Sequence, residues 1–177
     1  MKYVDASAVL RLLFSEPGPS VPVAAGEHLV SSRLVEVETF RAVDRERLLG
    51  HLDDTETAVK RKELTDLLAM LDLASIDGRV IERAKSTFAV NLRALDAIHV
   101  ATAEILASDA GVPVEFWTHD DRQAVAALSR GLTVRGVSTD DTPLGPKSRK
   151  PKRRHRRRRA ASRPLRFQDP KARKVRS

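Results

Sequence analysis

The chain has 177 residues, which suits one domain of ordinary size. Its 41% apolar content supports a single core, and with only 4% aromatic residues that core must be mostly aliphatic. The absence of cysteine excludes disulfides and thiolate metal sites and favours a reducing compartment. The N-terminus lacks the pattern of a signal peptide, and no apolar run approaches the roughly 20 residues that span a bilayer. We therefore expect a cytoplasmic protein with no membrane partner.

The net charge of +8 combines two regions of opposite sign. Residues 143–177 hold 16 Lys or Arg and one acid, whereas residues 1–142 hold 16 basic and 23 acidic residues. An acidic body therefore carries a strongly basic tail. We expect residues 1–142 to form one folded domain. We expect residues 143–177 to be disordered, because their dense like charges repel and few apolar residues are available for a core.

Apolar periodicity divides the body into alternating strands and helices. Strands are expected at residues 3–4, 28–31, 73–76, 114–118 and 132–137. Helices are expected at residues 6–14, 32–49, 55–71, 78–89, 91–110 and 120–129. Between the first helix and the second strand, residues 15–27 contain three prolines and two glycines and should form a loop. This order predicts an α/β fold with a central parallel sheet of four to five strands, flanked by helices.

Two of the predicted helices have apolar stripes that should face the core. In the helix at residues 55–71 the stripe consists of Val59, Leu64, Leu67, Leu68 and Leu71. The helix at residues 91–110 is the most apolar, and its expected core face consists of Leu95, Ile98, Ala101, Ile105 and Leu106.

Four acids fall where this architecture would bring them together. Asp5 and Asp120 each follow a strand and begin a helix, at the edge of a parallel sheet where ligands bind. Glu38 lies in the helix after the second strand, and Asp96 lies near the start of the most apolar helix. An ordinary structural role is open to each: a helix N-cap for Asp5 and Asp120, and a solvated helix acid for Glu38 or Glu36.

Clustered carboxylates repel one another unless a cation neutralises them. Ligand sets made only of oxygen suit Mg²⁺ or Mn²⁺. The chemistry that uses such a cluster is metal-assisted phosphoryl transfer or phosphodiester hydrolysis.

Four segments of the chain carry a family resemblance. VDASAVL, SSRLVEVETFRA, LRALDAIHVATA and WTHDDRQAVAAL resemble, in order and spacing, the four acidic motifs of PIN-domain ribonucleases. Within that superfamily the chain is most similar to the VapC toxins of bacterial toxin–antitoxin pairs, over residues 1–138. The resemblance implies a Mg²⁺- or Mn²⁺-dependent endoribonuclease with an RNA substrate, a cognate antitoxin and a homodimeric state. In such proteins the helices corresponding to residues 32–49 and 55–71 help to form a clamp for an antitoxin peptide.

The resemblance also assigns roles to individual residues. The metal-binding and catalytic acids would be Asp5, Glu38, Asp96 and Asp120. Glu38 is preferred to Glu36 because an arginine usually follows the family's acid three residues later. Here that arginine is Arg41, which we assign to RNA binding.

Supporting polar residues accompany the first and last acids. Asp120 is preferred to its neighbour Asp121 because the family pattern is Thr-x-Asp, here beginning at Thr118. Thr118, Ser7 and Asp121 would interact with the acids without binding the metal themselves. His99 would be a hydrogen-bond partner of the acid one turn before it or a substrate contact, unless it is simply a histidine packed within its helix.

Rival folds that begin with a strand and an aspartate fit less well. A haloacid-dehalogenase-type phosphatase needs a second Asp where this chain has Ser7, and a receiver domain needs a pair of acids after its first strand. A dinucleotide-binding fold needs a glycine-rich turn after the first strand, and this chain has no glycine at that point. The remaining alternative is a non-catalytic PIN-like module that binds RNA or protein, although such a module has no need of all four acids. Many relatives have a helix where residues 15–27 form a loop, which is a departure from the family pattern.

The basic tail has a separate interpretation. Its densest run is KSRKPKRRHRRRR, at residues 147–159, and we assign Lys152, Arg153 and Arg154 to RNA binding through phosphate contacts. Alternatively, its arginines bind transiently to the acidic cluster of the same molecule and reduce activity. A third possibility is that the tail is an extension without a role.

Overall fold

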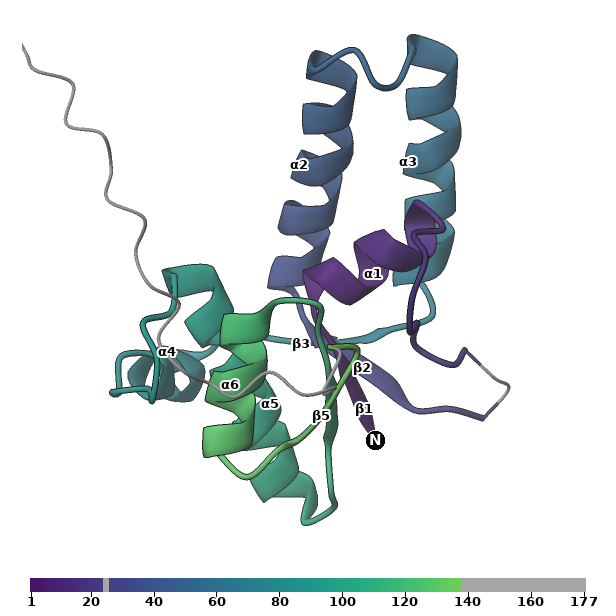
Figure 1. Cartoon of the computed structure of the whole chain (residues 1–177). Coiled ribbons are helices and arrows are strands. Elements are labelled where there is room, and N and C mark those ends of the chain that lie inside the picture. The colour runs from purple at the N-terminus through teal and green to yellow at the C-terminus, as the bar shows by residue number, and fades with distance from the viewer. Residues whose placement is uncertain (24–25, 138–177) are drawn as a thin grey trace, which may run out of the picture. The chain divides into compact units, whose positions relative to one another are not determined.

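The computed structural model describes residues 1–23 and 26–137 (Figure 1). Its strands are β1 (Lys2–Val4), β2 (Leu29–Ser32), β3 (Asp72–Ala74), β4 (Glu115–Trp117) and β5 (Thr133–Arg135). Its helices are α1 (Ala6–Leu13), α2 (Leu34–Leu48), α3 (Asp54–Leu68), α4 (Gly78–Ala84), α5 (Ala94–Ala110) and α6 (Asp121–Ser129). This order of elements confirms the predicted α/β fold. The basic tail, with the assigned residues Lys152, Arg153 and Arg154, lies outside the described residues.

The five strands form one parallel sheet in the order β3-β2-β1-β4-β5. The chain therefore builds the sheet outward from β1 in one direction and then returns to add β4 and β5 on its other side. Such a reversal of strand order is the switch point at which ligands bind in open α/β sheets. Because Val4 is in register with Trp117, the segments that follow β1 and β4 leave the sheet side by side.

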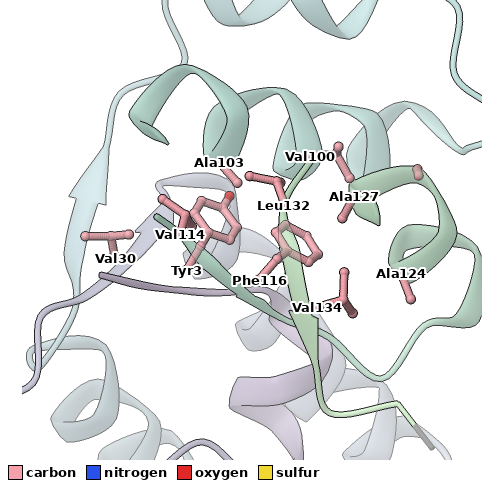
Figure 2. Packing of buried hydrophobic residues seen from close by; sticks show 11 residues of the cluster. Tyr3, Val30, Val100, Ala103, Val114, Phe116, Ala124, Ala127, Leu132 and Val134 are labelled. Carbon is pink, nitrogen blue, oxygen red and sulfur yellow. The ribbon is translucent and has the colours of Figure 1, made fainter. Parts of the chain in front are cut away.

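Side chains of the strands alternate between two hydrophobic cores, one on each face of the sheet. The first core lies against α5 and α6 and includes Tyr3 and Phe116, whose rings stack with centroids 5.2 Å apart (Figure 2). The second core lies against α1, α2 and α3 and includes the next residues of the same strands, Val4 and Trp117. Burial of apolar surface, worth about 25 cal/mol per Å², holds both helical layers to the sheet.

Helices α2 and α3 form an antiparallel pair that stands beyond the sheet, with α1 crossing near its base (Figure 1). The second helix of the pair begins at a capping box, in which Asp53 accepts from the backbone of Glu56 and the Glu56 side chain accepts from the backbone of Asp53. Near the end of the first helix, Leu48 and Leu49 are exposed. The pair thus presents both charged and apolar groups to solvent.

Several predicted boundaries and core positions were wrong. Helix α4 ends at Ala84 and α5 begins at Ala94. The irregular segment between the two helices packs Phe88, Val90 and Leu92 against the first core. Leu95 is 44% exposed, since it lies in the first turn of α5, before the buried segment begins. Val59 is 50% exposed on α3. The loop at residues 15–27 contains neither helix nor strand in its described part, as predicted.

Candidate active site

A cleft of about 500 Å³ opens at the carboxyl edge of the sheet, beside the switch point. It is lined by residues from α1, α2, α5, α6 and the turns that follow β1 and β4. All four acids singled out in the sequence line this one cleft: Asp5, Glu38, Asp96 and Asp120. The fold therefore gathers carboxylates that are spread over more than 100 positions of the chain.

Asp5 occupies the junction between β1 and α1 and is only 2% exposed. One of its oxygens, Oδ1, caps the helix by accepting from the backbone of Ala8 at 2.9 Å, and it also accepts from Ser7 Oγ at 2.7 Å. The other, Oδ2, accepts from Thr118 Oγ1 at 2.8 Å. Burial raises the pKa of Asp5, although the hydrogen bonds from these donors oppose the shift. Its roles as helix cap and as cleft residue are compatible.

Asp120, like Asp5, both caps a helix and lines the cleft. Its Oδ1 accepts from the backbone N–H groups of Arg122 and Gln123 at 2.8 and 2.9 Å, so it is the N-cap of the helix. The residue is exposed at the edge of the cleft. The neighbouring Asp121 begins the helix and is absent from the cleft lining that the described residues form.

Gln123 is a cleft residue that sequence reasoning missed. Its amide nitrogen donates to Asp96 Oδ1 at 3.1 Å, and its amide oxygen lies 3.1 Å from Thr118 Oγ1. Because Gln123 is 4% exposed, this amide is held in place between α5 and the β4–α6 turn. The available signal in the sequence was a glutamine three residues after Asp120, in the first turn of the predicted helix.

Glu38 and His99 form the fourth part of the site. The Nε2 atom of His99 lies 2.6 Å from Glu38 Oε2, and its Nδ1 atom lies 2.8 Å from the Tyr3 hydroxyl. Of the readings left open for His99, a hydrogen bond to Asp96 is therefore wrong: residues one turn apart share a helix face, but the imidazole points across to α2. The rival acid Glu36 is absent from the cleft lining and instead lies 4.0 Å from Arg33.

Two arginines on α2 complete the lining. Arg41 and Arg45 follow Glu38 at intervals of three and four residues, on the same face of the helix. Their side chains are 73% and 67% exposed and pair with Asp44 at 3.1 Å and with Glu46 at 3.7 Å. The cleft thus changes from acidic at the sheet to basic along α2.

Gly136 packs closely against the turn between β4 and α6. Its φ of +94° suits glycine, and a Cβ atom there would lie 2.5 Å from the carbonyl oxygen of Thr118. His119, in the same turn, donates from Nδ1 to the Gly136 carbonyl at 2.6 Å and from its backbone N–H to Ser7 Oγ at 2.8 Å. Burial lowers the pKa of His119, which favours its neutral form.

The donor set fits a divalent cation. Among the described residues, no ion pair joins a lysine or arginine to any of the four acids, so their negative charges are left for another partner. Across that same part of the chain, three or more acids or histidines are nowhere grouped as closely as ligands around one ion. The four carboxylates share a cleft but are oriented by protein hydrogen bonds. Binding of one ion by several of them would therefore draw these carboxylates closer together than they lie here.

Comparison with known proteins places this cleft in a family. Residues 2–129 match the PIN domain. The chain is 37% identical over 135 residues to ribonuclease VapC46 of Mycobacterium tuberculosis, a match that covers 75% of this chain and 94% of the relative. It is 36% identical over 110 residues to ribonuclease VapC47 of the same species, covering 58% and 74% of the two chains. No helix among the described residues is long and apolar enough to cross a membrane. The chain belongs to the PIN-domain family and is a VapC-type member of it.

Proposed function

We propose that this protein is a metal-dependent endoribonuclease and the toxin of a toxin–antitoxin pair. The observation that carries the proposal is the convergence of Asp5, Glu38, Asp96 and Asp120 from separate elements on one cleft. Two relatives that are named as ribonucleases support the choice of RNA as the substrate. The basic stretch of α2 beside the acids suits a polyanionic strand.

In this proposal the four acids hold Mg²⁺ or Mn²⁺, the ions that prefer oxygen ligands. When bound, such an ion lowers the pKa of a water molecule and stabilises the charge that develops on the phosphate. Asp5 is kept in orientation by its three donors, and Gln123 orients Asp96. The hydrogen bonds thus restrain the orientation of these two acids before the substrate arrives.

Arg41 and Arg45 would bind the phosphates that flank the scissile bond. Both guanidinium groups are largely exposed, so they can leave their surface partners for an RNA phosphate at little cost. Their spacing along α2 would direct the strand away from the acids toward the end of the helix, where Leu48 also lines the cleft.

The family suggests three further features. We propose a cognate antitoxin protein as a partner, a homodimeric state, and a cytoplasmic location. The antiparallel pair of α2 and α3, with exposed Val37, Leu48 and Leu49, offers apolar surface for protein contacts.

The test is RNA cleavage by the purified full-length protein with Mg²⁺, with Mn²⁺ and with EDTA. We expect cleavage with either metal, and background levels with EDTA or in the variants Asp5→Asn and Asp96→Asn. Asp66→Asn is a matched control, because Asp66 is an exposed acid paired with Lys62 on α3. Equal cleavage by wild type and both cleft variants would show that the site is wrong. RNA binding without cleavage under every metal condition would favour the non-catalytic alternative.

A further inference from the structure

A buried histidine connects three of the elements that carry the acids. His99 is 1% exposed and lies on α5, one turn after Asp96. It contacts Tyr3, which lies on β1 two residues before Asp5, and it contacts Glu38 on α2. The imidazole thus fills the space behind the cleft where these three elements meet.

The direction of each hydrogen bond follows from the available protons. The backbone N–H of Ser32 donates to the Tyr3 hydroxyl at 3.0 Å, and the hydroxyl proton of Tyr3 can be donated to Nδ1 of His99, which lies 2.8 Å away. Burial raises the pKa of Tyr3, so this phenol keeps its proton. With Nδ1 accepting, a neutral His99 carries its proton on Nε2 and donates it to Glu38.

This arrangement fixes one oxygen of Glu38 and leaves the other available. Only Oε2 takes part in the hydrogen bonds among described residues, and the side chain is 20% exposed where it reaches the cleft. A free glutamate side chain loses rotamer entropy when it is ordered around a ligand. A donor locked in the core removes that cost before the ligand binds, as outer partners of metal-binding residues do.

We propose that His99 is a positioning residue that holds Glu38 at the cleft with its Oε1 atom available to the divalent cation, an inference that rests on the function proposed above. Tyr3 in turn fixes the tautomer of His99 and the orientation of its ring. Because Tyr3 and Asp5 belong to the same short segment, this chain of hydrogen bonds also sets the position of Glu38 relative to Asp5.

The variants His99→Gln and His99→Asn separate positioning from packing. A glutamine amide can accept from Tyr3 and still donate to Glu38, whereas asparagine is one carbon shorter and cannot reach both. Val100→Ala is the control, because Val100 is fully buried on the same helix and belongs to the first core. Each full-length variant would be measured for Mn²⁺ affinity by calorimetry, for RNA cleavage, and for thermal unfolding without metal.

We expect His99→Asn to weaken Mn²⁺ binding by about 10- to 100-fold, and His99→Gln to remain within about threefold of wild type. Val100→Ala should lower the unfolding temperature without changing Mn²⁺ affinity. Equal losses in the Gln and Asn variants, or losses in Mn²⁺ affinity no larger than in Val100→Ala, would overturn the positioning role.

Two outcomes distinguish this inference from the proposed function. If wild type binds Mn²⁺ and cuts RNA while His99→Asn does so equally well, only the role of His99 is wrong. If wild type neither binds Mn²⁺ nor cuts RNA, the proposed function fails and this inference fails with it. Nitrogen-15 NMR of the metal-free protein gives an independent readout: we expect a proton on Nε2 of His99, and an Nε2 atom without a proton would overturn the direction of the hydrogen bond to Glu38.

Discussion

Thr118 Oγ1 lies 2.8 Å from Asp5 Oδ2, although 113 residues separate them in the chain. The contact exists because β1 and β4 are paired neighbours, so the residues that follow each strand meet at the same edge. Thr118 is fully buried and also accepts from the backbone N–H of Asp120 at 3.1 Å. One hydroxyl therefore joins the first and last acids of the site.

We predict that Thr118→Val lowers the free energy of unfolding by about 1–3 kcal/mol, because it removes a donor from a buried carboxylate. Thr118→Ser keeps the hydroxyl and should lose less. Urea denaturation of the metal-free protein measures both effects. Thr57→Val is the control, since Thr57 is a buried threonine of α3 that donates only to the backbone of Asp53. Equal stability of the Val and Ser variants would contradict the role of this hydroxyl.

Asp5→Asn should stabilise the metal-free protein at neutral pH. Since burial raises the pKa of Asp5, the folded state binds more protons than the unfolded state between the two pKa values. The stability of wild type therefore falls as pH rises from about 4, the usual aspartate pKa, through the folded pKa, and the Asn variant lacks this loss. We therefore expect the variant to melt at a higher temperature than wild type at pH 7.

The difference between Asp5→Asn and wild type should shrink below about pH 4. Saturating Mn²⁺ should raise the melting temperature of wild type only, since a ligand stabilises the state that binds it. Melting curves at several pH values, with and without Mn²⁺, measure both effects. A variant that is less stable than wild type at pH 7 without metal would contradict the prediction.

Gln123→Leu should weaken Mn²⁺ binding by about 10-fold, because Asp96 loses the amide that orients it. Leucine keeps most of the buried volume, so a change in metal affinity can be separated from a loss of packing. Calorimetry with Mn²⁺ provides the measurement. Ser129→Ala, at the far end of the same helix, is the control, because Ser129 donates only to the backbone of Ala126. An unchanged affinity in Gln123→Leu would mean that Asp96 does not depend on this amide.

Arg41→Gln and Arg45→Gln should each weaken RNA binding and make it less sensitive to salt. Each phosphate contact contributes roughly 0.7 to the slope of log affinity against log salt for a single strand. Fluorescence anisotropy with a short RNA in EDTA, across a salt series, gives that slope. Arg79→Gln is the control, because Arg79 pairs with Asp109 on α5, outside the cleft lining. Slopes equal to that of wild type would exclude phosphate contacts by these arginines.

Removal of residues 143–177 tests the basic tail. We predict weaker RNA binding and a flatter salt dependence, because 16 basic residues are lost with a single acid. Binding is measured in the same anisotropy assay, and cleavage is measured in parallel. Faster cleavage by the shortened protein would instead support a tail that restrains activity. Unchanged binding and cleavage would indicate that the tail has no role in either.

The order of the elements could be predicted because hydrophobic periodicity is a local signal, and the family motifs indicated which acids to follow. The motifs also indicated Ser7 and Thr118 as residues that accompany the acids, but they did not indicate which side chains contact which acid. His99 and Glu38 are 61 residues apart and Thr118 and Asp5 are 113 apart, so their contacts arise only once the strands pair. Local reasoning paired His99 with its neighbour on the same helix, whereas tertiary packing directs its ring to another one.

Core positions at element ends were also hard to predict. Leu95 has the spacing of a core residue, but it lies in the first turn of α5, where the helix extends past the packed layer. Periodicity indicates which face of a helix is apolar, but it does not indicate where along the helix the contact with the sheet begins.

Gly136 shows that the site also depends on a position that contributes no functional group. Any side chain there would push against the carbonyl of Thr118 and displace the turn that carries Asp120. The conformation of this turn therefore depends partly on the absence of a side chain at residue 136. Ranking positions by the chemistry of their side chains would overlook this residue, although the spacing between the first and last acids depends on it.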